Sequence, residues 1–204
     1  MNQNLFKIKK PVEQSDNGVS EMKAAFIHDH NFVFDQNSKK VYDGSGGAFS
    51  FELWQRYLKI FSSLIVVGRK VNSLPNKLIL SSYENVSFEL VAEFQSYKDK
   101  LTNRRAVNTQ LLETVKQVEL VIIRLPSTLG YMAINHCRKL GKNYILEIVG
   151  DPFEAYWNYG TYLTKFIAPI EALKLKCATR FAPACIYVTK DYLQKKYPTR
   201  GLQE

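Results

Sequence analysis

The chain has 204 residues, of which 46% are hydrophobic and 23% charged, a composition that excludes an intrinsically disordered protein. Its apolar runs are much shorter than the roughly 18–20 residues of a membrane-spanning helix, and no apolar stretch follows the first lysines as a secretory signal requires, so a cytoplasmic protein is expected. The formal net charge of +9 favours nucleic acid, an anionic lipid surface or a phosphorylated substrate as partner, although a solvated basic surface has the same composition.

Residues 1–21 are expected to form a lead-in segment, and from residue 22 onward apolar runs alternate with helical patterns. Several runs are continuously apolar, which is typical of strands buried on both faces of a parallel sheet. The expected strands are Lys23–His28, Ser63–Gly68, Lys77–Ser82, Val86–Ala92, Leu120–Arg124, Tyr144–Gly150 and Ala184–Thr189.

Helical patterns fill most of the stretches between these strands. Apolar residues recur on one helical face within residues 49–61, and a long helix is expected within residues 98–117. Ser127 suits the N-cap of a helix that ends before Gly141, and Pro169 suits the first position of another helix. Basic residues gather near the start of the long helix, namely Lys98, Lys100, Arg104 and Arg105.

This alternation predicts one Rossmann-like, doubly wound α/β domain over residues 22–198, with a mainly parallel sheet and helices on both faces. Residues 31–42 are expected to form a small β-hairpin after the first strand. Residues 199–204 have loop character, so they are expected to be a linker at which the chain stops before a second domain.

A glycine-rich turn, Asp43–Gly47, directly precedes the first helix. Backbone N–H groups at a helix N-terminus attract anions, and glycines let a ligand approach the backbone closely. Ser45, Gly46 and Gly47 are therefore candidate substrate-binding residues. The turn lacks the spacing of a dinucleotide-binding motif and the Lys-Ser/Thr of a P-loop, and a plain tight turn is the alternative.

Polar residues also follow buried strands, where open α/β sheets bind ligands. His28 and His30 point to one side of their strand; His30 is a candidate for lining the site, but a third metal ligand is not apparent and neither metal nor cofactor is expected. Arg124 has the geometry to bind a phosphate with two hydrogen bonds or to form an ion pair with a carboxylate. Ser127 either contacts the same ligand or caps the helix.

Asp151 follows the buried strand that ends at Gly150. A carboxylate there is placed to orient or deprotonate a sugar hydroxyl, which makes Asp151 the candidate catalytic residue. Asp followed by Pro152 is also ordinary chemistry for the start of a helix. An aromatic cluster comes next, suited to stacking on sugars, to a bilayer interface or to packing: Tyr156, Trp157, Tyr159 and Tyr162.

Three parts of the chain carry a family resemblance. They are the glycine turn with residues 51–58 and 65–69, then residues 147–152 with 155–160, then residues 186–198. Together they resemble family 4-like glycosyltransferases of the GT-B fold, in the branch that builds capsular polysaccharides and exopolysaccharides. The resemblance covers about residues 22–198 and is most specific in the last two parts.

The resemblance implies the N-terminal, acceptor-side half of a retaining, metal-independent hexosyltransferase. A second domain would hold the nucleotide-sugar donor, so this chain alone is expected to be inactive. The acceptor is expected to be a lipid-linked glycan, with the protein peripheral at the inner membrane face and not bound to nucleic acid. In such enzymes the glycine loop faces the cleft, and a polar residue, often histidine, touches the reacting sugar at the position that Asp151 matches here.

Other classes fit the sequence less well. A GT-B-like sugar-nucleotide epimerase and a basic Rossmann module that binds nucleotides or nucleic acid are the alternatives. A dinucleotide-dependent oxidoreductase would need Gly-x-Gly-x-x-Gly after the first strand and an acidic ribose anchor. A nucleic-acid-binding module would need a helix-turn-helix, a zinc ligand set or a ribonucleoprotein motif, and the sequence shows none of them.

Three expectations follow from this interpretation. The loops 44–47, 124–127 and 150–153 should meet at one edge of the sheet. The basic helix start should support binding to anionic vesicles that weakens as salt rises. In the full-length enzyme, Asp151→Asn should lower turnover by about 10²–10⁴-fold if Asp151 is a general base, less if it only positions substrate, and not at all if it is a helix cap, because Asn caps nearly as well.

Overall fold

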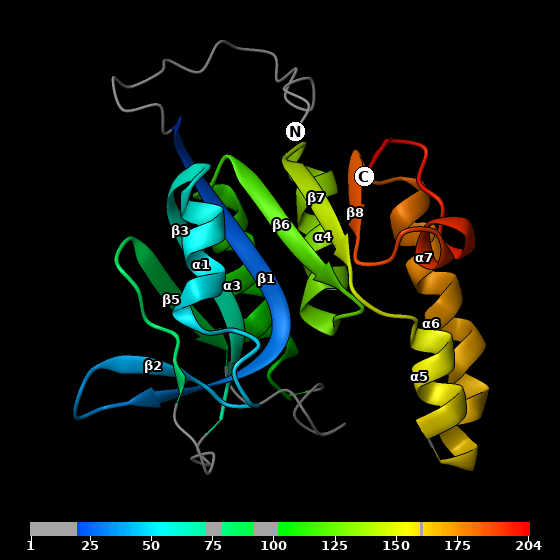
Figure 1. Cartoon of the computed structure of the whole chain (residues 1–204), viewed down its shortest axis with the longest axis horizontal. Helices are drawn as coiled ribbons and strands as arrows, with labels where there is room; N and C mark the ends of the chain where they lie inside the picture. Colours follow the sequence, from blue (N-terminus) through cyan, green and yellow to red (C-terminus); the bar gives the residue numbers. More distant parts are fainter. Residues whose placement is uncertain (1–19, 72–78, 92–101, 160) are drawn as a thin grey trace.

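The computed structural model describes residues 20–71, 79–91, 102–159 and 161–204, which form a twisted sheet with helices on both faces (Figure 1). The strands are β1 (Ser20–Asp35), β2 (Lys40–Asp43), β3 (Phe61–Lys70), β4 (Ile79–Leu80), β5 (Val86–Val91), β6 (Leu120–Leu125), β7 (Asn143–Ile148), β8 (Ala184–Tyr187) and β9 (Leu202–Gln203). The helices are α1 (Phe51–Leu58), α3 (Arg104–Lys116), α4 (Thr128–Leu140), α5 (Pro152–Tyr159), α6 (Tyr162–Arg180) and α7 (Tyr192–Lys196).

The sheet is mainly parallel, as the sequence predicts. Strands β5, β3, β1, β6, β7, β8 and β9 lie side by side in this order, and each neighbouring pair is parallel. Among the described residues, the antiparallel pairs are β1 with β2 and β2 with β4, at the end of the long β1. The chain winds outward from β1 first on one side and then on the other, which is the doubly wound arrangement.

The two faces of the sheet bury separate apolar clusters. Ala24 and Phe26 of β1 pack with Trp54 of α1 on one face, whereas Ala25 and Ile27 face the cluster that includes α3 and α4. Figure 1 shows α1 in front of the sheet and both other helices behind it. Successive residues of a strand point to opposite faces, so a continuously apolar run is required where both faces are covered.

Helix α4 begins and ends where the sequence predicts. The Ser127 side chain accepts a hydrogen bond from the N–H of Gly130 at 2.9 Å, which satisfies one of the free amides of the first turn. At the other end, Gly141 adopts a left-handed conformation with φ 63°.

Several boundaries differ from the sequence expectations. β1 continues beyond His28 to Asp35, because its second half pairs with β2. Pro169 lies inside α6 and not at its first position, since the helix already begins at Tyr162. Lys98 and Lys100 of the expected basic helix start, Lys77 and Ala92 of two expected strands, and almost all of the expected lead-in lie outside the described residues.

The segment expected to be a linker adds a strand to the sheet. Leu202 and Gln203 form β9, which pairs with Ala184 and Cys185 of β8. The chain passes so close to the preceding loop that a Cβ on Gly201 would lie 2.2 Å from the carbonyl oxygen of Pro183. Glycine is therefore needed at residue 201, a constraint that loop composition alone does not reveal.

Candidate functional site

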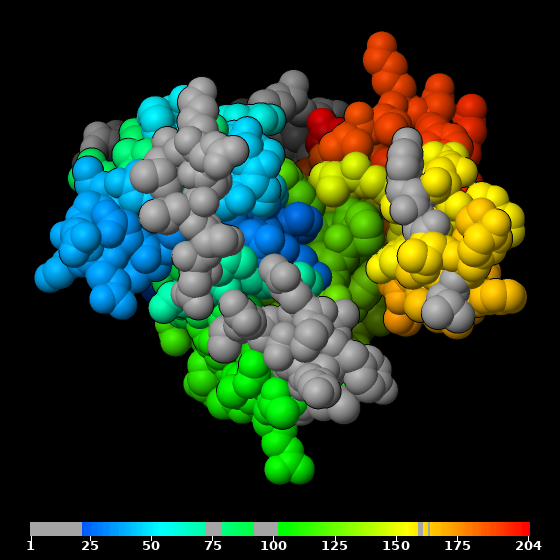
Figure 2. Space-filling model, turned by 90° about the horizontal axis from the view of Figure 1, so that it is seen from below, coloured from blue at the N-terminus to red at the C-terminus, as the bar shows by residue number. Residues whose placement is uncertain are grey.

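The strand order reverses between β1 and β6, and their carboxyl ends lie at the lower edge of the sheet in Figure 1. In open α/β sheets this reversal leaves a place for ligands outside the carboxyl ends of the strands. Figure 2 looks onto this edge, where residues of β1 in blue and of the β6–α4 region in light green come to the surface beside the yellow α5. The candidate site lies at this edge of the sheet.

Asp43, the last residue of β2, organises the glycine turn. Its carboxylate is fully buried and accepts hydrogen bonds from the N–H groups of Ser45 (2.6 Å), Gly47 (3.0 Å) and Phe49 (2.8 Å). Burial opposes ionisation, but these hydrogen bonds and the contact with His30 outweigh it, so the pKa of Asp43 lies below its usual value. The turn is thus wrapped around a buried carboxylate.

His30 supports this carboxylate from β1. Its Nε2 lies 2.9 Å from Oδ1 of Asp43, and its ring stacks on Phe49 with 3.9 Å between centroids. Burial lowers the pKa of His30 below its usual value despite the neighbouring Asp43. At neutral pH the ring is uncharged and donates its Nε2–H to the carboxylate, so in this structure His30 positions the turn.

The candidate residues of the turn divide into two groups. The N–H groups of Ser45 and Gly47 donate hydrogen bonds to Asp43, so in this structure they are not free to bind a ligand. Gly46 and Gly47 both have positive φ, 111° and 99°, a conformation that residues with side chains rarely adopt. The Ser45 side chain and Gly46 are exposed at the surface of the turn, and their contact with substrate stays a prediction.

Asp29 occupies the N-terminus of α4. Its carboxylate accepts hydrogen bonds from the N–H groups of Thr128 (2.7 Å) and Leu129 (2.8 Å), and Arg69 donates to it at 2.6 Å. A helix N-terminus is where a phosphate group would otherwise bind. Together with Ser127, which caps Gly130 and is itself buried, Asp29 uses three of the first amides of this helix.

Arg124 and Glu147 form a part-buried ion pair between β6 and β7. Nε and Nη2 of Arg124 lie 3.0 and 2.9 Å from Oε2 of Glu147, and Tyr57 donates its hydroxyl to Oε1 at 2.6 Å. The guanidinium lies 5.1 Å from the ring centroids of Phe26 and Phe49. Arg124 therefore forms an ion pair with a carboxylate, which was the alternative to phosphate binding. Phosphate binding by Arg124 stays a prediction.

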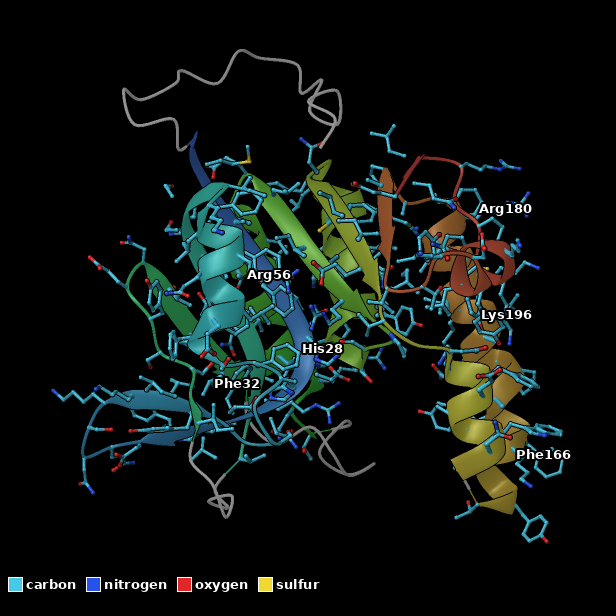
Figure 3. The ribbon with its side chains drawn as sticks, viewed as in Figure 1. His28, Phe32, Arg56, Phe166, Arg180 and Lys196 are labelled. Carbon is cyan, nitrogen blue, oxygen red and sulfur yellow. The ribbon has the colours of Figure 1, made fainter. Side chains whose placement is uncertain are left out.

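His28 of β1 has a buried ring nitrogen without a hydrogen-bond partner. This nitrogen is Nδ1, and the ring stacks on Phe49 with 5.4 Å between centroids. The pKa of His28 is lowered to about 4, mainly by burial, with smaller contributions from Arg124, His30 and Arg69 and an opposing effect of Asp29. The half-buried ring thus reaches the candidate site as a neutral imidazole (Figure 3).

Asp151 is engaged on all sides by the chain itself. Its carboxylate accepts hydrogen bonds from the N–H of Phe153 (2.9 Å) and the hydroxyls of Tyr197 (2.6 Å) and Tyr192 (2.7 Å), and it forms an ion pair with Lys196. Only 4% of its side chain is exposed. Burial opposes ionisation, but these contacts prevail, so the pKa of Asp151 lies below its usual value.

This geometry gives Asp151 a structural role, which is to begin α5 and to hold α7 against it. A buried carboxylate with both oxygens occupied has no free position for a substrate hydroxyl. The catalytic role predicted from its place after β7 therefore stays a prediction without a contact in this structure to support it.

The three loops meet at one edge, as predicted. Phe49, at the end of the glycine turn, contacts Arg124, and the N–H of Val149 donates to the carbonyl of Leu125 at 3.0 Å. Sequence reasoning did not propose Asp29, Glu147 or Tyr57 as site residues, and it chose His30 and not His28 to line the site. The signal for Asp29 was a carboxylate at the end of the first strand opposite a helix start, but Glu147 and Tyr57 lie within regular elements and become partners only through packing.

Two further observations concern metal binding and cavities. Among the described residues, no three His, Cys, Asp or Glu side chains are grouped so as to hold a metal ion. A cavity of about 400 Å³ lies elsewhere, beside the β1–β2 hairpin, lined by Phe34, Lys39, Val41, Lys70, Ser82, Val86, Phe88 and Leu90. None of the candidate site residues lines it.

The chain is similar in sequence to a curated protein. The chain is 36% identical over 183 residues to Protein CapJ of Staphylococcus aureus, an alignment that covers 88% of this chain and 45% of that protein. The chain therefore spans about half the length of this curated relative. No protein-family model matches the chain.

Solved structures define the fold. Sucrose-phosphate synthase from Thermosynechococcus elongatus matches with a TM-score of 0.54 at 10% identity, over 90% of this chain and 47% of that one. A UGT transferase from Siraitia grosvenorii in complex with UDP matches with a TM-score of 0.46 at 11% identity, over 86% and 46% of the two chains. At such low identity the likeness to the synthase concerns the fold alone, which is the Rossmann-like fold of GT-B proteins.

Proposed function

We propose that the chain is the acceptor-side half of a GT-B glycosyltransferase that transfers a sugar from a nucleotide-sugar donor to a lipid-linked glycan in surface polysaccharide biosynthesis. The family resemblance of the sequence and the GT-B fold support the class of enzyme. As the resemblance implies, transfer proceeds with retention and without a metal ion.

The observation that carries the assignment to the acceptor side is the carboxylate of Asp29 at the N-terminus of α4. Nucleotide phosphates readily bind free amides at a helix start, and open α/β sheets bind ligands where the strand order reverses, as it does beside α4. Here Asp29 accepts from two of those amides. A phosphate would have to displace this carboxylate, so the donor is expected to bind to the other half of the enzyme.

The same edge suits an uncharged, hydroxyl-bearing acceptor. Arg124 and Glu147 neutralise each other and Tyr57 donates a hydrogen bond to Glu147, while His28 is neutral because its pKa is lowered to about 4. We assign His28 the role of hydrogen-bonding a sugar hydroxyl of the acceptor. Ser45 and Gly46, which are exposed on the glycine turn, are the proposed further contacts.

The proposed place of action is the surface of an anionic membrane facing the cytoplasm, where a lipid-linked acceptor is presented. The net charge of +9 favours such a surface. Among the described residues, none of the helices has the length and apolar character needed to cross a bilayer. Arg104 and Arg105, at the start of α3, are both exposed.

Sugar transfer tests the proposal. We expect the protein that carries this chain together with a donor-binding half to move radiolabel from one of a panel of UDP-, GDP- and CMP-sugars into butanol-extractable lipid of isolated membranes. The chain alone, with the same donors and membranes, should transfer no label. Epimerised or hydrolysed donor without labelled lipid, or transfer by the chain alone, would contradict the proposal.

A further inference from the structure

Helix α6 carries a row of large apolar side chains on its outer face. Tyr162, Phe166, Ile170 and Leu173 follow one another at spacings of three or four residues, and their exposed fractions are 85%, 78%, 54% and 61%. Residues at such spacings share one face of a helix. These four side chains, which we call the outer stripe, thus form a continuous apolar surface.

The outer stripe is a second apolar face and not the core face of the helix. Ala168, Leu175, Ala178 and Thr179 are buried and turn toward the rest of the protein. Figure 1 shows α5 and α6 side by side at one end of the sheet, and Figure 3 shows Phe166 on the side of this pair that faces away from the sheet. Trp157 of α5, 48% exposed, extends the apolar surface.

The charges beside the outer stripe are positive. Lys165 lies 5.3 Å from the ring centroid of Tyr162 and 5.9 Å from that of Trp157. Lys174, Lys176 and Arg180 follow along the same helix, all exposed. The one acidic residue of α6, Glu171, is 18% exposed and is paired with Lys174 at 2.6 Å.

We propose that α5 and α6 form a docking surface for an anionic lipid bilayer, with the outer stripe and Trp157 inserted among the lipids and the basic residues at the headgroups. An amphipathic helix with an apolar face, flanking lysines and interfacial aromatic residues lies in the plane of a membrane in this way. The 19 residues of α6 give a contact about 28 Å long. This inference rests on the membrane location in the proposed function.

Charge complementarity distinguishes lipid from protein occupants of this surface. A symmetric pair of α6 helices from two copies would bring Lys165, Lys176 and Arg180 of one copy close to those of the other, and like charges at an interface are unfavourable. An anionic bilayer supplies phosphate groups for all of these cations and an apolar interior for the outer stripe.

The two tryptophans of the chain make the test specific. Trp54 is fully buried, whereas Trp157 lies at the docking surface, so a change in tryptophan emission on adding vesicles reports on Trp157. We expect vesicles of phosphatidylcholine and phosphatidylglycerol (1:1) to shift the emission to the blue and to protect it from acrylamide. Phosphatidylcholine vesicles should do so at least tenfold more weakly.

Variants then locate the surface. Phe166→Ser with Leu173→Ser should weaken anionic vesicle binding at least tenfold, and Lys165→Gln with Lys176→Gln should reduce its salt dependence. The control Val188→Ser, at a residue 65% exposed on the loop after β8, should bind as wild type. Arg104→Gln with Arg105→Gln tests the other basic surface and should have the smaller effect.

Three results would overturn the docking surface. The first is equal binding by wild type and by Phe166→Ser with Leu173→Ser. The second is a dimer in solution that the same pair of substitutions dissociates, since a second copy would then cover the outer stripe. The third is a Trp157 already shielded from acrylamide without lipid in the protein that carries both halves, which would place the donor half over it. Vesicle binding without any sugar transfer would instead leave the docking surface intact and count against the proposed function.

Discussion

Replacing Asp43 by alanine is expected to lower the free energy of unfolding by about 3–5 kcal/mol, because each buried donor left without an acceptor costs about 1–3 kcal/mol. The carboxylate is fully buried and accepts hydrogen bonds from three backbone N–H groups and from the ring of His30. Alanine leaves these donors without an acceptor, and the turn from Ser45 to Phe49 loses the group around which it folds. Urea unfolding of the chain, followed by circular dichroism, measures the change.

Asp35→Ala is the matched control for this experiment. Asp35 also accepts backbone N–H groups, those of Asn37 (3.1 Å) and Ser38 (3.2 Å), but its hydrogen bonds are exposed to solvent. We expect a loss of no more than about 1 kcal/mol, because water replaces the missing acceptor. Similar losses for the two variants would show that burial of Asp43 does not set the stability of the glycine turn.

The stabilising effect of this network should also depend on pH. The pKa values of Asp43 and His30 are both lowered on folding, so each group contributes stability at neutral pH. The contribution of His30 falls once the pH drops below about 6.5, the value for an unperturbed histidine, and that of Asp43 falls in more acidic solution. Acid below about pH 4, where the loss comes from Asp43 itself, should therefore destabilise wild type more than Asp43→Ala.

Replacing His28 by phenylalanine is expected to lower kcat for sugar transfer by about 10²-fold, as for other groups that hydrogen-bond at the reacting centre. Phenylalanine keeps a ring to stack on Phe49, as His28 does at 5.4 Å, but it has no atom that can hydrogen-bond a sugar hydroxyl. We expect kcat to fall and the melting temperature to change little. The measurement is transfer by the protein that carries both halves, at saturating donor.

His28→Gln separates hydrogen bonding from packing, since its amide retains a donor and an acceptor near the position of Nε2. We expect it to recover part of the activity that phenylalanine loses. In wild type, the His28 resonances should titrate near pH 4, because burial lowers the pKa to about that value. Wild-type turnover in His28→Phe would remove His28 from the site.

Much of the fold could be predicted because its determinants are local in the sequence. Residues 120–123 are apolar on both faces, and they form most of a central strand of the sheet. Ser127 and Gly141 mark the two ends of α4 through their own conformations. The second half of β1 pairs with β2 in the hairpin that the sequence predicts at residues 31–42. Strand β9 depends instead on pairing with β8, which lies elsewhere in the sequence and leaves no local signal in residues 199–204.

The position of the candidate site could be predicted from the sequence, but the contacts of its residues could not. Residues that follow strands were expected to meet, and the glycine turn and Arg124 do meet through Phe49. Which of them stays available to a ligand depends on partners distant in sequence. Asp151 is enclosed by Tyr192 of α7 and by Tyr197 just after it, whereas His28 is only half-buried.

The outer stripe shows a further reason why the sequence was ambiguous. A helical repeat of apolar residues indicates which side chains share a face, but it does not say whether that face is covered. Helix α6 has small buried residues, such as Ala168 and Ala178, on its core face and large apolar residues on its outer face. Size and hydrophobicity alone would therefore place the wrong face in the core.

The central claim is that the edge of the sheet at β1 and β6 binds the acceptor and that the donor nucleotide binds elsewhere. Amide hydrogen exchange of residues 43–49 and 124–130, in the protein that carries both halves, tests it most directly. We predict that a detergent extract of lipid-linked glycans slows exchange in both segments, while UDP or GDP alone leaves them unchanged because Asp29 already occupies the start of α4. Slower exchange of these segments with UDP or GDP alone, or no change in them with the glycan extract, would contradict the account.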